Sequence, residues 1–166
     1  MTLWIENVAW DDVVNGWHSD LGPNCILIRI GDPDIRSFPL PKHNFVAQFP
    51  FLFLDAEDKD GVPEKHKISD EQAKELVDIL QVALDTENNV IVHCHAGICR
   101  SGAVVEVGTM MGFTATERFR QPNLRVKHKM MKALGWSYDS DEKEYSVGGT
   151  TSAGGILIPF SGVNDD

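Results

Sequence analysis

The sequence lacks most of the features that mark secreted and membrane-bound chains. Its 166 residues include only three cysteines, Cys25, Cys94 and Cys99, and this small odd number argues against a disulfide framework. No apolar run approaches the roughly 20 residues of a membrane-spanning helix. The first residues, MTLWIENVAWDD, have neither the basic nor the apolar part of a secretory signal. We therefore expect a cytoplasmic location and no membrane partner.

Positive charge is also scarce. The chain has 15 Lys and Arg residues against 25 Asp and Glu residues, a formal net charge of −10, which repels nucleic acid and anionic membranes. A hydrophobic content of 42% in a chain of this length suits one domain with a real core. We predict one domain over residues 1–137. A polar, glycine-rich and mostly loose tail is expected over residues 138–166, with Ile156–Phe160 as a candidate edge strand.

Three apolar runs have the composition of buried β-strands. Cys25–Ile30 ends at a Gly-Asp-Pro turn signal, and Phe49–Leu54 runs into the polar segment Asp55–Lys67. Val90–His93 is short, apolar and rich in β-branched residues, which is typical of a central strand buried on both faces. Together with the helices between them, these runs favour an α/β fold with a central, mostly parallel sheet.

A helix is predicted to begin after Ser69. Ser69 is a favourable N-cap, and Gln72 stands three residues later, as in a capping box. Apolar residues then recur at helical spacing and predict one buried face. That face consists of Ala73, Leu76, Val77, Leu80, Ala83 and Leu84.

Two more helices are expected later in the chain. Ser101–Met111 is apolar enough to be largely buried, and a last helix runs from Asn123 to a stop at Gly135. Its predicted inward residues are Val126, Met130, Ala133 and Leu134. The basic residues of this region are Arg118, Arg120, Arg125, Lys127, Lys129 and Lys132. We interpret them as a solvated face rather than a patch that faces substrate.

The segment that carries chemistry is Val90–Gly102, VIVHCHAGICRSG. A buried strand runs into Cys94, and a helix begins near Arg100. A loop wound before a helix N-terminus directs several backbone N–H groups into one concavity, where the helix dipole adds positive potential. Such a nest binds a tetrahedral oxyanion. Gly97 in the middle of the loop permits a backbone angle or a close approach that a side chain would block.

Three side chains of this segment suit phosphoryl transfer. The amides and the helix dipole would stabilise the thiolate of Cys94, which can attack phosphorus. Arg100 offers a planar fork of donors for two phosphate oxygens. The hydroxyl of Ser101 can donate to the sulfur when the thiolate has to leave.

The run His93–Ser101, HCHAGICRS, resembles the H-C-x-x-G-x-x-R-S signature of cysteine-based protein tyrosine and dual-specificity phosphatases. Outside the motif the resemblance covers roughly Phe51–Leu134 in the order of elements. It implies an α/β fold of the protein tyrosine phosphatase type, with a central parallel sheet flanked by helices, and no metal or organic cofactor. The resemblance makes Cys94, Arg100 and Ser101 catalytic. The phosphate-binding loop is then His95, Ala96, Gly97, Ile98 and Cys99, supported by His93 and Asn123.

The same resemblance implies a general acid, an aspartate on a loop upstream of the motif and after a strand. Three aspartates stand in the matching segment. Alignment by the end of the strand favours Asp58, with Asp55 second and Asp60 third. A solvated acidic loop is the alternative for all three.

The expected reaction is hydrolysis of phosphotyrosine, and of phosphoserine or phosphothreonine, in a protein or in a small phosphomonoester. Three alternatives stay open: an arsenate reductase, a rhodanese-like enzyme, and a catalytically silent phosphate-binding module. A metal site at His93, Cys94, His95 and Cys99 is disfavoured, because adjacent residues rarely bind one zinc ion and no second ligand pair exists. Cys99 is either a small buried residue or the partner of Cys94 in a reversible disulfide.

Overall fold

The structure, a computed structural model, describes residues 2–136. The predicted tail 138–166 and the candidate strand Ile156–Phe160 lie outside the described residues. The chain divides into two units, Met1–Met130 and Met131–Asp166. The sheet and the site described below belong to the first unit.

A five-stranded parallel sheet forms the centre of the first unit. Its strands stand in the order β3-β2-β4-β1-β5, and every neighbouring pair is parallel. The strands are β1 (Trp4–Ala9), β2 (Cys25–Gly31), β3 (Ala47–Leu52), β4 (Asn89–Cys94) and β5 (Thr114–Ala115). This architecture confirms the predicted α/β fold with a mostly parallel sheet flanked by helices.

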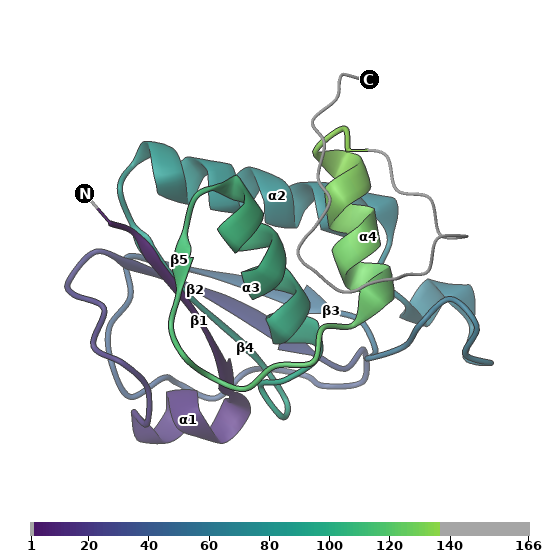
Figure 1. Cartoon of the computed structure of the whole chain (residues 1–166). Helices are drawn as coiled ribbons and strands as arrows, with labels where there is room; N and C mark the ends of the chain where they lie inside the picture. The colour runs from purple at the N-terminus through teal and green to yellow at the C-terminus, as the bar shows by residue number, and fades with distance from the viewer. Residues whose placement is uncertain (1, 137–166) are drawn as a thin grey trace. The chain divides into compact units, whose positions relative to one another are not determined.

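The described residues also form four α-helices. They are α1 (Trp10–Asn15), α2 (Asp70–Asp85), α3 (Arg100–Met111) and α4 (Leu124–Ala133), with a 3₁₀ turn, η1, at Glu64–His66. In Figure 1, α2 and α3 lie side by side, and both contact β4, while α3 also contacts β1 and β5. None of the helices within residues 2–136 has the length and apolarity that crossing a bilayer requires.

The central strands β2 and β4 are buried on both faces, which explains why they have nearly continuous apolar sequences, whereas the edge strands β3 and β5 are partly exposed. On one face Val8, Leu27 and Ile91 pack with Val13 of α1. On the opposite face Ile5 points to α3, where its side chain lies 2.7 Å from the position that a Cβ on Gly108 would take. The sheet is therefore fixed from both sides, and the strand ends that hold the site inherit that rigidity.

The position of β4 decides where the site lies. This strand pairs with β2 on one side and with β1 on the other, so its carboxyl end meets the carboxyl ends of both. Cys94 is its last residue and stands opposite Ala9, the last residue of β1. Ligands of open parallel sheets bind at this edge.

The structure differs from the sequence prediction at three places. The run predicted as a strand over Phe49–Leu54 forms β3 two residues earlier, and its end leaves the sheet to bond elsewhere: the N–H of Leu54 donates to the carbonyl of His66. Ala133 was expected to face inward and is exposed, whereas the buried apolar residues of α4 are Val126, Met130 and Met131. Leu84, at the end of the predicted α2 face, is half-buried.

The predicted cap of α2 is present and gives a stability test. Ser69 Oγ accepts the N–H of Gln72 at 3.0 Å, and Gln72 Oε1 accepts the N–H of Ser69 at 3.0 Å. We expect Ser69→Ala to lower the free energy of unfolding by about 1 kcal/mol, because the N–H of Gln72 loses its acceptor. Ser69→Asp keeps an acceptor for the N–H of Gln72 and should change the free energy of unfolding by only a few tenths of a kcal/mol. Urea unfolding measures both, and equal stabilities for the two variants would contradict the cap.

Candidate active site

The catalytic loop, residues 94–100, joins the end of β4 to the start of α3. The Cys94 side chain is buried and its sulfur faces the inside of the loop. Sγ accepts the backbone N–H of Gly97 at 3.3 Å and lies 3.2 Å from Ser101 Oγ. Two donors that can stabilise a thiolate therefore already contact the sulfur.

The carbonyl groups of the loop point outward. Four of them accept a hydrogen bond from a neighbouring segment of the fold. The pairs, donor first, are Trp10 N to His95 O (3.2 Å), Asn7 Nδ2 to Gly97 O (2.8 Å), Gln121 N to Ile98 O (3.1 Å) and Asn123 N to Cys99 O (2.9 Å). In a planar trans peptide the N–H points opposite to the carbonyl, so the N–H groups that follow these carbonyls face the inside of the loop. This is the geometry of an anion-binding nest.

Gly97 allows the loop to lie against β1. Its φ is +76°, a left-handed conformation that side chains disfavour. A Cβ at this position would lie 2.4 Å from the backbone nitrogen of Ala9 and 2.4 Å from the carbonyl carbon of Val8. The structure therefore supports both reasons that the sequence offered for a glycine here.

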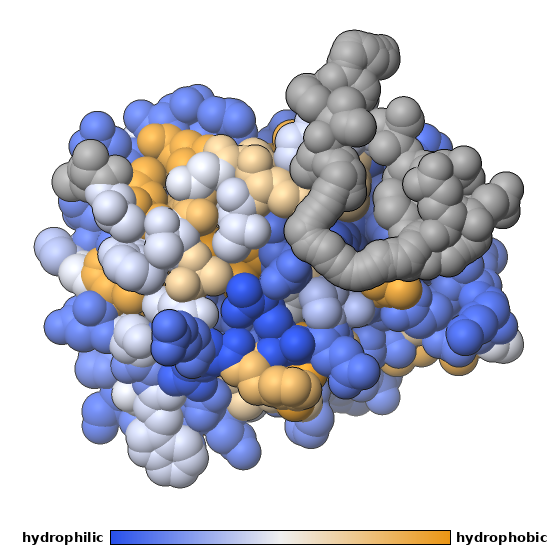
Figure 2. Space-filling model, viewed as in Figure 1, coloured by the Kyte–Doolittle hydropathy of each residue, from blue (hydrophilic) through white to orange (hydrophobic). Residues whose placement is uncertain are grey.

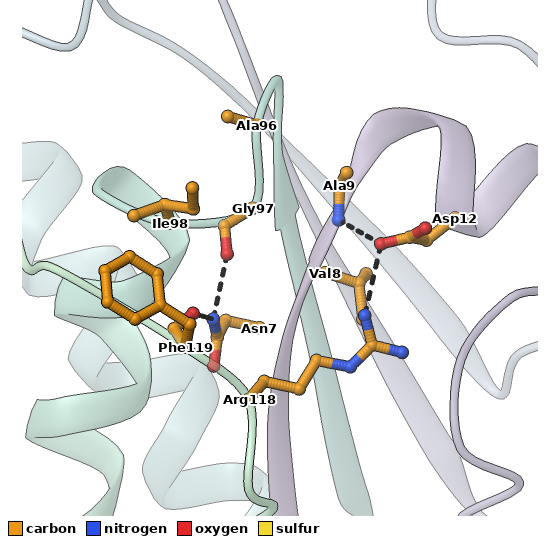
Figure 3. A pocket seen from close by; sticks show the side chains of 9 residues that line it. All are labelled: Asn7, Val8, Ala9, Asp12, Ala96, Gly97, Ile98, Arg118 and Phe119. Atoms are coloured by element: carbon orange, nitrogen blue, oxygen red, sulfur yellow. Dashed lines mark hydrogen bonds and ion pairs between the residues drawn. The ribbon is translucent and has the colours of Figure 1, made fainter.

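A pocket of about 350 Å³ borders the outer side of the loop. Figure 3 shows Asn7 at its base, where Nδ2 donates to the carbonyls of Gly97 and of Phe119 at 2.8 and 3.0 Å. Across the pocket Asp12 accepts from Arg118. Cys94 does not line this pocket, so the pocket flanks the sulfur's concavity rather than containing it. The sequence analysis did not identify Asn7 as a site residue; the one indication in the sequence is that it is a polar residue in a buried strand.

Arg100 begins α3 and is almost fully buried. Its Nη1 donates to the carbonyl of Phe53 and to Asp32 Oδ1, both at 2.8 Å. Its buried Nε has no acceptor among the described residues. An unsatisfied buried guanidinium donor beside an amide nest fits an oxyanion that is bound there.

Asp32 was missed as a site residue, because Gly31-Asp32-Pro33 resembles an ordinary turn. The available signal was topological: Asp32 follows β2, and β2 pairs with β4. The carboxylate of Asp32 and the carbonyl of Phe53 hold the Arg100 side chain from the side of β2 and β3. The structure thus orients the guanidinium before any substrate arrives.

His93 supports the loop as a neutral, packed residue. Arg29 Nε donates to His93 Nε2 at 3.1 Å, and since that nitrogen accepts, the proton belongs on Nδ1, 3.4 Å from the carbonyl of Cys94. Burial, and next the charge of Arg29, lower the pKa of His93 to about 3. The ring is therefore uncharged at neutral pH. The structure agrees with the interpretation of His93 as a residue that shapes the loop.

The three candidate acids lie in different surroundings. The exposed Asp55 accepts from Asn123 Nδ2 at 2.8 Å and lies beside the thiol of Cys99. Asp58 is engaged by Arg125 Nη1 at 2.8 Å, and Asp60 accepts the N–H of Glu57 within its own turn. The structure thus brings Asp55 to the catalytic loop and turns Asp58, the favoured residue of the sequence prediction, toward α4. The alignment that favoured Asp58 assumed that the strand runs to Leu54, whereas β3 ends at Leu52.

Asn123 connects the parts of the site. Besides donating to Cys99 O and Asp55, its Nδ2 contacts the carbonyl of Ala56 at 3.2 Å. Its Oδ1 accepts the N–H of Val126 at 3.0 Å and so caps α4. The residue expected to open the last helix therefore also ties the catalytic loop to the segment that carries Asp55.

The other two cysteines differ from Cys94. Burial raises the pKa of Cys25 to about 12, which agrees with a core residue. Cys99 is half-buried, and burial, followed by the charge of Asp55 and a hydrogen bond with it, raises the pKa of its thiol. Within residues 2–136 no group of three or more His, Cys, Asp or Glu residues is arranged to hold a metal ion.

The basic residues from Arg118 to Lys129 are not a freely solvated face, which corrects the sequence interpretation. Figure 2 shows strongly hydrophilic residues next to a hydrophobic patch where this segment crosses the molecule. Most of the cations have acidic partners, because the surrounding chain is rich in carboxylates. The ion pairs are Arg118 with Glu6 and Asp12, Arg120 and Lys127 with Glu106, Arg125 with Asp58 and Glu64, and Lys129 with Asp70.

Residues 56–111, about a third of the chain, match the model of a protein family. The family is described as "Tc-R-P: Polymorphic toxin system, DSP-PTPase phosphatase". The matched segment contains the whole catalytic loop and ends with α3. No curated protein matches the sequence.

Solved structures that match this chain include three proteins named as phosphatases or as phosphatase-like. A mouse putative dual specificity phosphatase, crystallised with zinc tungstate, is 16% identical, with a TM-score of 0.43 and coverage of 67% of this chain and 69% of that one. The human tyrosine phosphatase-like serine/threonine/tyrosine-interacting protein is 16% identical, with a TM-score of 0.44 and coverage of 68% of this chain and 78% of that one. The tyrosine phosphatase OH1 of Orf virus is 14% identical, with a TM-score of 0.42 and coverage of 80% of this chain and 88% of that one.

The family match and the loop agree with each other. The matched segment contains a strand that ends in Cys94, a glycine that closes the loop against β1, and Arg100 and Ser101 at the start of a helix. Over residues 56–111, which contain the whole catalytic loop, the chain is therefore similar to the DSP-PTPase phosphatases that the matching family model describes.

Proposed function

We propose that this protein hydrolyses phosphotyrosine, and with it phosphoserine and phosphothreonine, through a phosphocysteine intermediate. The observation that carries the proposal is the orientation of the catalytic loop. Its carbonyls accept hydrogen bonds from outside the loop, so that its amides face the side where Cys94 lies, and the buried Nε of Arg100 has no acceptor among the described residues. A phosphoryl dianion has the charge and the shape for which such a cradle provides donors.

In the first step the thiolate of Cys94 attacks phosphorus and the bond from phosphorus to the ester oxygen breaks. Arg100 and the loop amides neutralise the charge on the phosphoryl oxygens. The leaving oxygen takes a proton, for which we assign Asp55 rather than Asp58 as the donor. Asp55 is exposed toward solvent and held by Asn123 next to the loop, whereas Asp58 bonds to Arg125.

In the second step a water molecule attacks the phosphocysteine. The carboxylate of Asp55 accepts a proton from this water, the sulfur–phosphorus bond breaks, and inorganic phosphate forms. The departing thiolate of Cys94 receives a hydrogen bond from the hydroxyl of Ser101, which lies 3.2 Å from the sulfur. The enzyme returns to its starting protonation state without a metal or organic cofactor.

The sequence of the loop supports protein substrates over lipid or nucleic-acid substrates. The loop side chains are His95, Ala96 and Ile98, so it lacks the lysines that would add charge for a polyphosphorylated headgroup. The net charge of −10 disfavours approach to RNA and to anionic membranes. A phosphorylated side chain in a protein, or a small phosphomonoester, is the substrate class that we propose.

The nucleophile is tested with p-nitrophenyl phosphate. We expect Cys94→Ser to lower the rate of hydrolysis by more than about a thousandfold, because an alcohol at this position is not ionised. Vanadate, a phosphate analogue, should still bind the variant through the loop amides and Arg100. An inert wild-type protein whose vanadate affinity equals that of Cys94→Ser would contradict the catalytic proposal and favour a binding module.

The assignment of the acid is tested by paired variants. Asp55→Asn should lower kcat on a phosphotyrosine peptide by about 10²- to 10⁴-fold, the usual contribution of a positioned proton donor. Asp58→Asn should stay within about threefold of wild type. The pH dependence of kcat is recorded for both, and a large loss in Asp58→Asn alone would restore Asp58 as the acid. A rhodanese-like sulfur transfer needs no such proton donor, so activity that survives in both variants favours that alternative.

The seat of the loop against β1 is tested by Gly97→Ala. The added methyl group meets the backbone of Val8 and Ala9, and we expect kcat/KM to fall by about a hundredfold, as for a displacement of roughly 1 Å at a reacting group. Gly61→Ala is the matched control, because Gly61 has no atom within 4 Å of its missing Cβ and no positive φ. Equal activity of both variants would show that the loop does not depend on this contact.

A further inference from the structure

The segment that carries Asp55 is attached to the start of α4. We define the acid loop as residues 55–67. Within it the carboxylate of Glu57 accepts two backbone N–H groups at the helix start: Oε2 accepts that of Leu124 at 2.9 Å, and Oε1 that of Arg125 at 3.3 Å. These N–H groups belong to the first turn, where no intrahelical carbonyl is available and the helix dipole favours a negative group. Glu57 thereby links the acid loop to a part of the fold 67 residues away.

Arg125 makes a second attachment. Its side chain is only 8% exposed, and its Nε and Nη2 donate to the carbonyl of Ile68 at 3.3 and 2.9 Å. From this fixed position the guanidinium reaches Asp58 at 2.8 Å and Glu64 at 3.2 Å. One buried cation of α4 thus contacts the middle and the end of the acid loop.

A buried lysine completes the arrangement inside the loop. Lys67 Nζ donates to the carbonyl of Asp58 at 2.9 Å and pairs with Glu64 at 3.1 Å. The hydrogen bond from Lys67, and next the charge of Arg125, hold the pKa of Glu64 below its ordinary value. Two cations therefore meet at one carboxylate and close the loop on itself.

Asp55 has few attachments of its own. Apart from its neighbourhood with Cys99, the carboxylate has one hydrogen bond, from Asn123, among the described residues, and its side chain is exposed. Its position must therefore come from the backbone on either side. The residues on its C-terminal side are held in three ways: Asn123 bonds the carbonyl of Ala56, the Glu57 side chain bonds the start of α4, and Arg125 bonds the Asp58 side chain.

We propose that Glu57 and Arg125 are positioning residues for proton transfer: they fasten the acid loop to α4, so that Asp55 stands beside the catalytic loop before substrate binds. Neither residue touches the reacting atoms. The inference rests on the proposed function, since it presupposes that Asp55 donates the proton. It goes further by naming what places the donor.

Leaving groups of different acidity test the proposal. A p-nitrophenolate ion departs without a proton, whereas the phenolate of phenyl phosphate requires one, so only the second ester depends on the position of Asp55. Single-turnover release of the phenol isolates the first step. We expect Glu57→Ala and Arg125→Met to slow release from phenyl phosphate by about tenfold and from p-nitrophenyl phosphate by less than about twofold.

Lys129→Met serves as the matched control. Lys129 lies on the same helix, and its ion pair with Asp70, at 2.7 Å, makes no contact with the acid loop. We expect this variant to match wild type on both esters. Thermal unfolding reports whether each variant folds, and if Arg125→Met does not fold, the half-exposed Glu57 still provides a variant that decides the question.

Two results would overturn the inference. The first is an equal loss on both esters, or no loss on either, in folded Glu57→Ala. The second is unchanged amide hydrogen exchange over residues 55–67 in that variant, where we expect faster exchange. The exchange measurement does not need activity. A wild-type protein that hydrolyses neither ester would therefore contradict the proposed function, while the attachment of the loop would still be decided by exchange.

Discussion

The site depends on the outward orientation of the carbonyls in the catalytic loop. A buried carbonyl needs a hydrogen-bond donor, and a peptide unit that turns its carbonyl outward turns the next N–H inward. The fold supplies the donors from three separate segments: the side chain of Asn7 in β1, the start of α1, and the strand-to-helix connection before α4. The loop can therefore bind an anion because its outward carbonyls find hydrogen-bond donors in the fold. The absence of a side chain at Gly97 lets the loop lie close enough to β1 for these bonds to form.

The same constraint explains how an acidic chain can bind a dianion. Positive potential is concentrated at one place, where the loop amides, the N-terminus of α3 and Arg100 converge. Arg100 is kept in place by Asp32 and the carbonyl of Phe53, and the nearby His93 is neutral because burial and Arg29 lower its pKa. Asp32 and the carbonyl of Phe53 therefore orient the guanidinium of Arg100 through Nη1, while Nε remains available to a bound phosphate.

Local rules of sequence predicted the parts of the structure that local forces determine. The cap at Ser69, the strand that ends at Cys94 and the glycine at position 97 each depend on a few neighbouring residues, and each is found where the sequence placed it. Asp32 and the choice between Asp55 and Asp58 depend on contacts between residues more than 60 positions apart. No spacing rule contains such contacts, because they follow from the order of the strands and from the point at which β3 leaves the sheet.

The acid loop shows how a flexible, polar segment can be held with little hydrophobic burial. The carboxylates of Asp58 and Glu64 are 78% and 71% exposed, so their ion pairs contribute little stability, typically under about 1 kcal/mol each. The hydrogen bonds to backbone are different. Arg125 and Lys67 are buried and donate to the carbonyls of Ile68 and Asp58, and a backbone carbonyl is a more rigid acceptor than an exposed side chain. A buried cation that lost such a carbonyl would remain partly unsatisfied, which costs more than an exposed pair contributes. The loop is therefore held mainly by hydrogen bonds that have a backbone group on one side, those of Glu57 with the N–H groups of Leu124 and Arg125 and that of Lys67 with the carbonyl of Asp58. The exposed ion pairs of Asp58 and Glu64 add little to them.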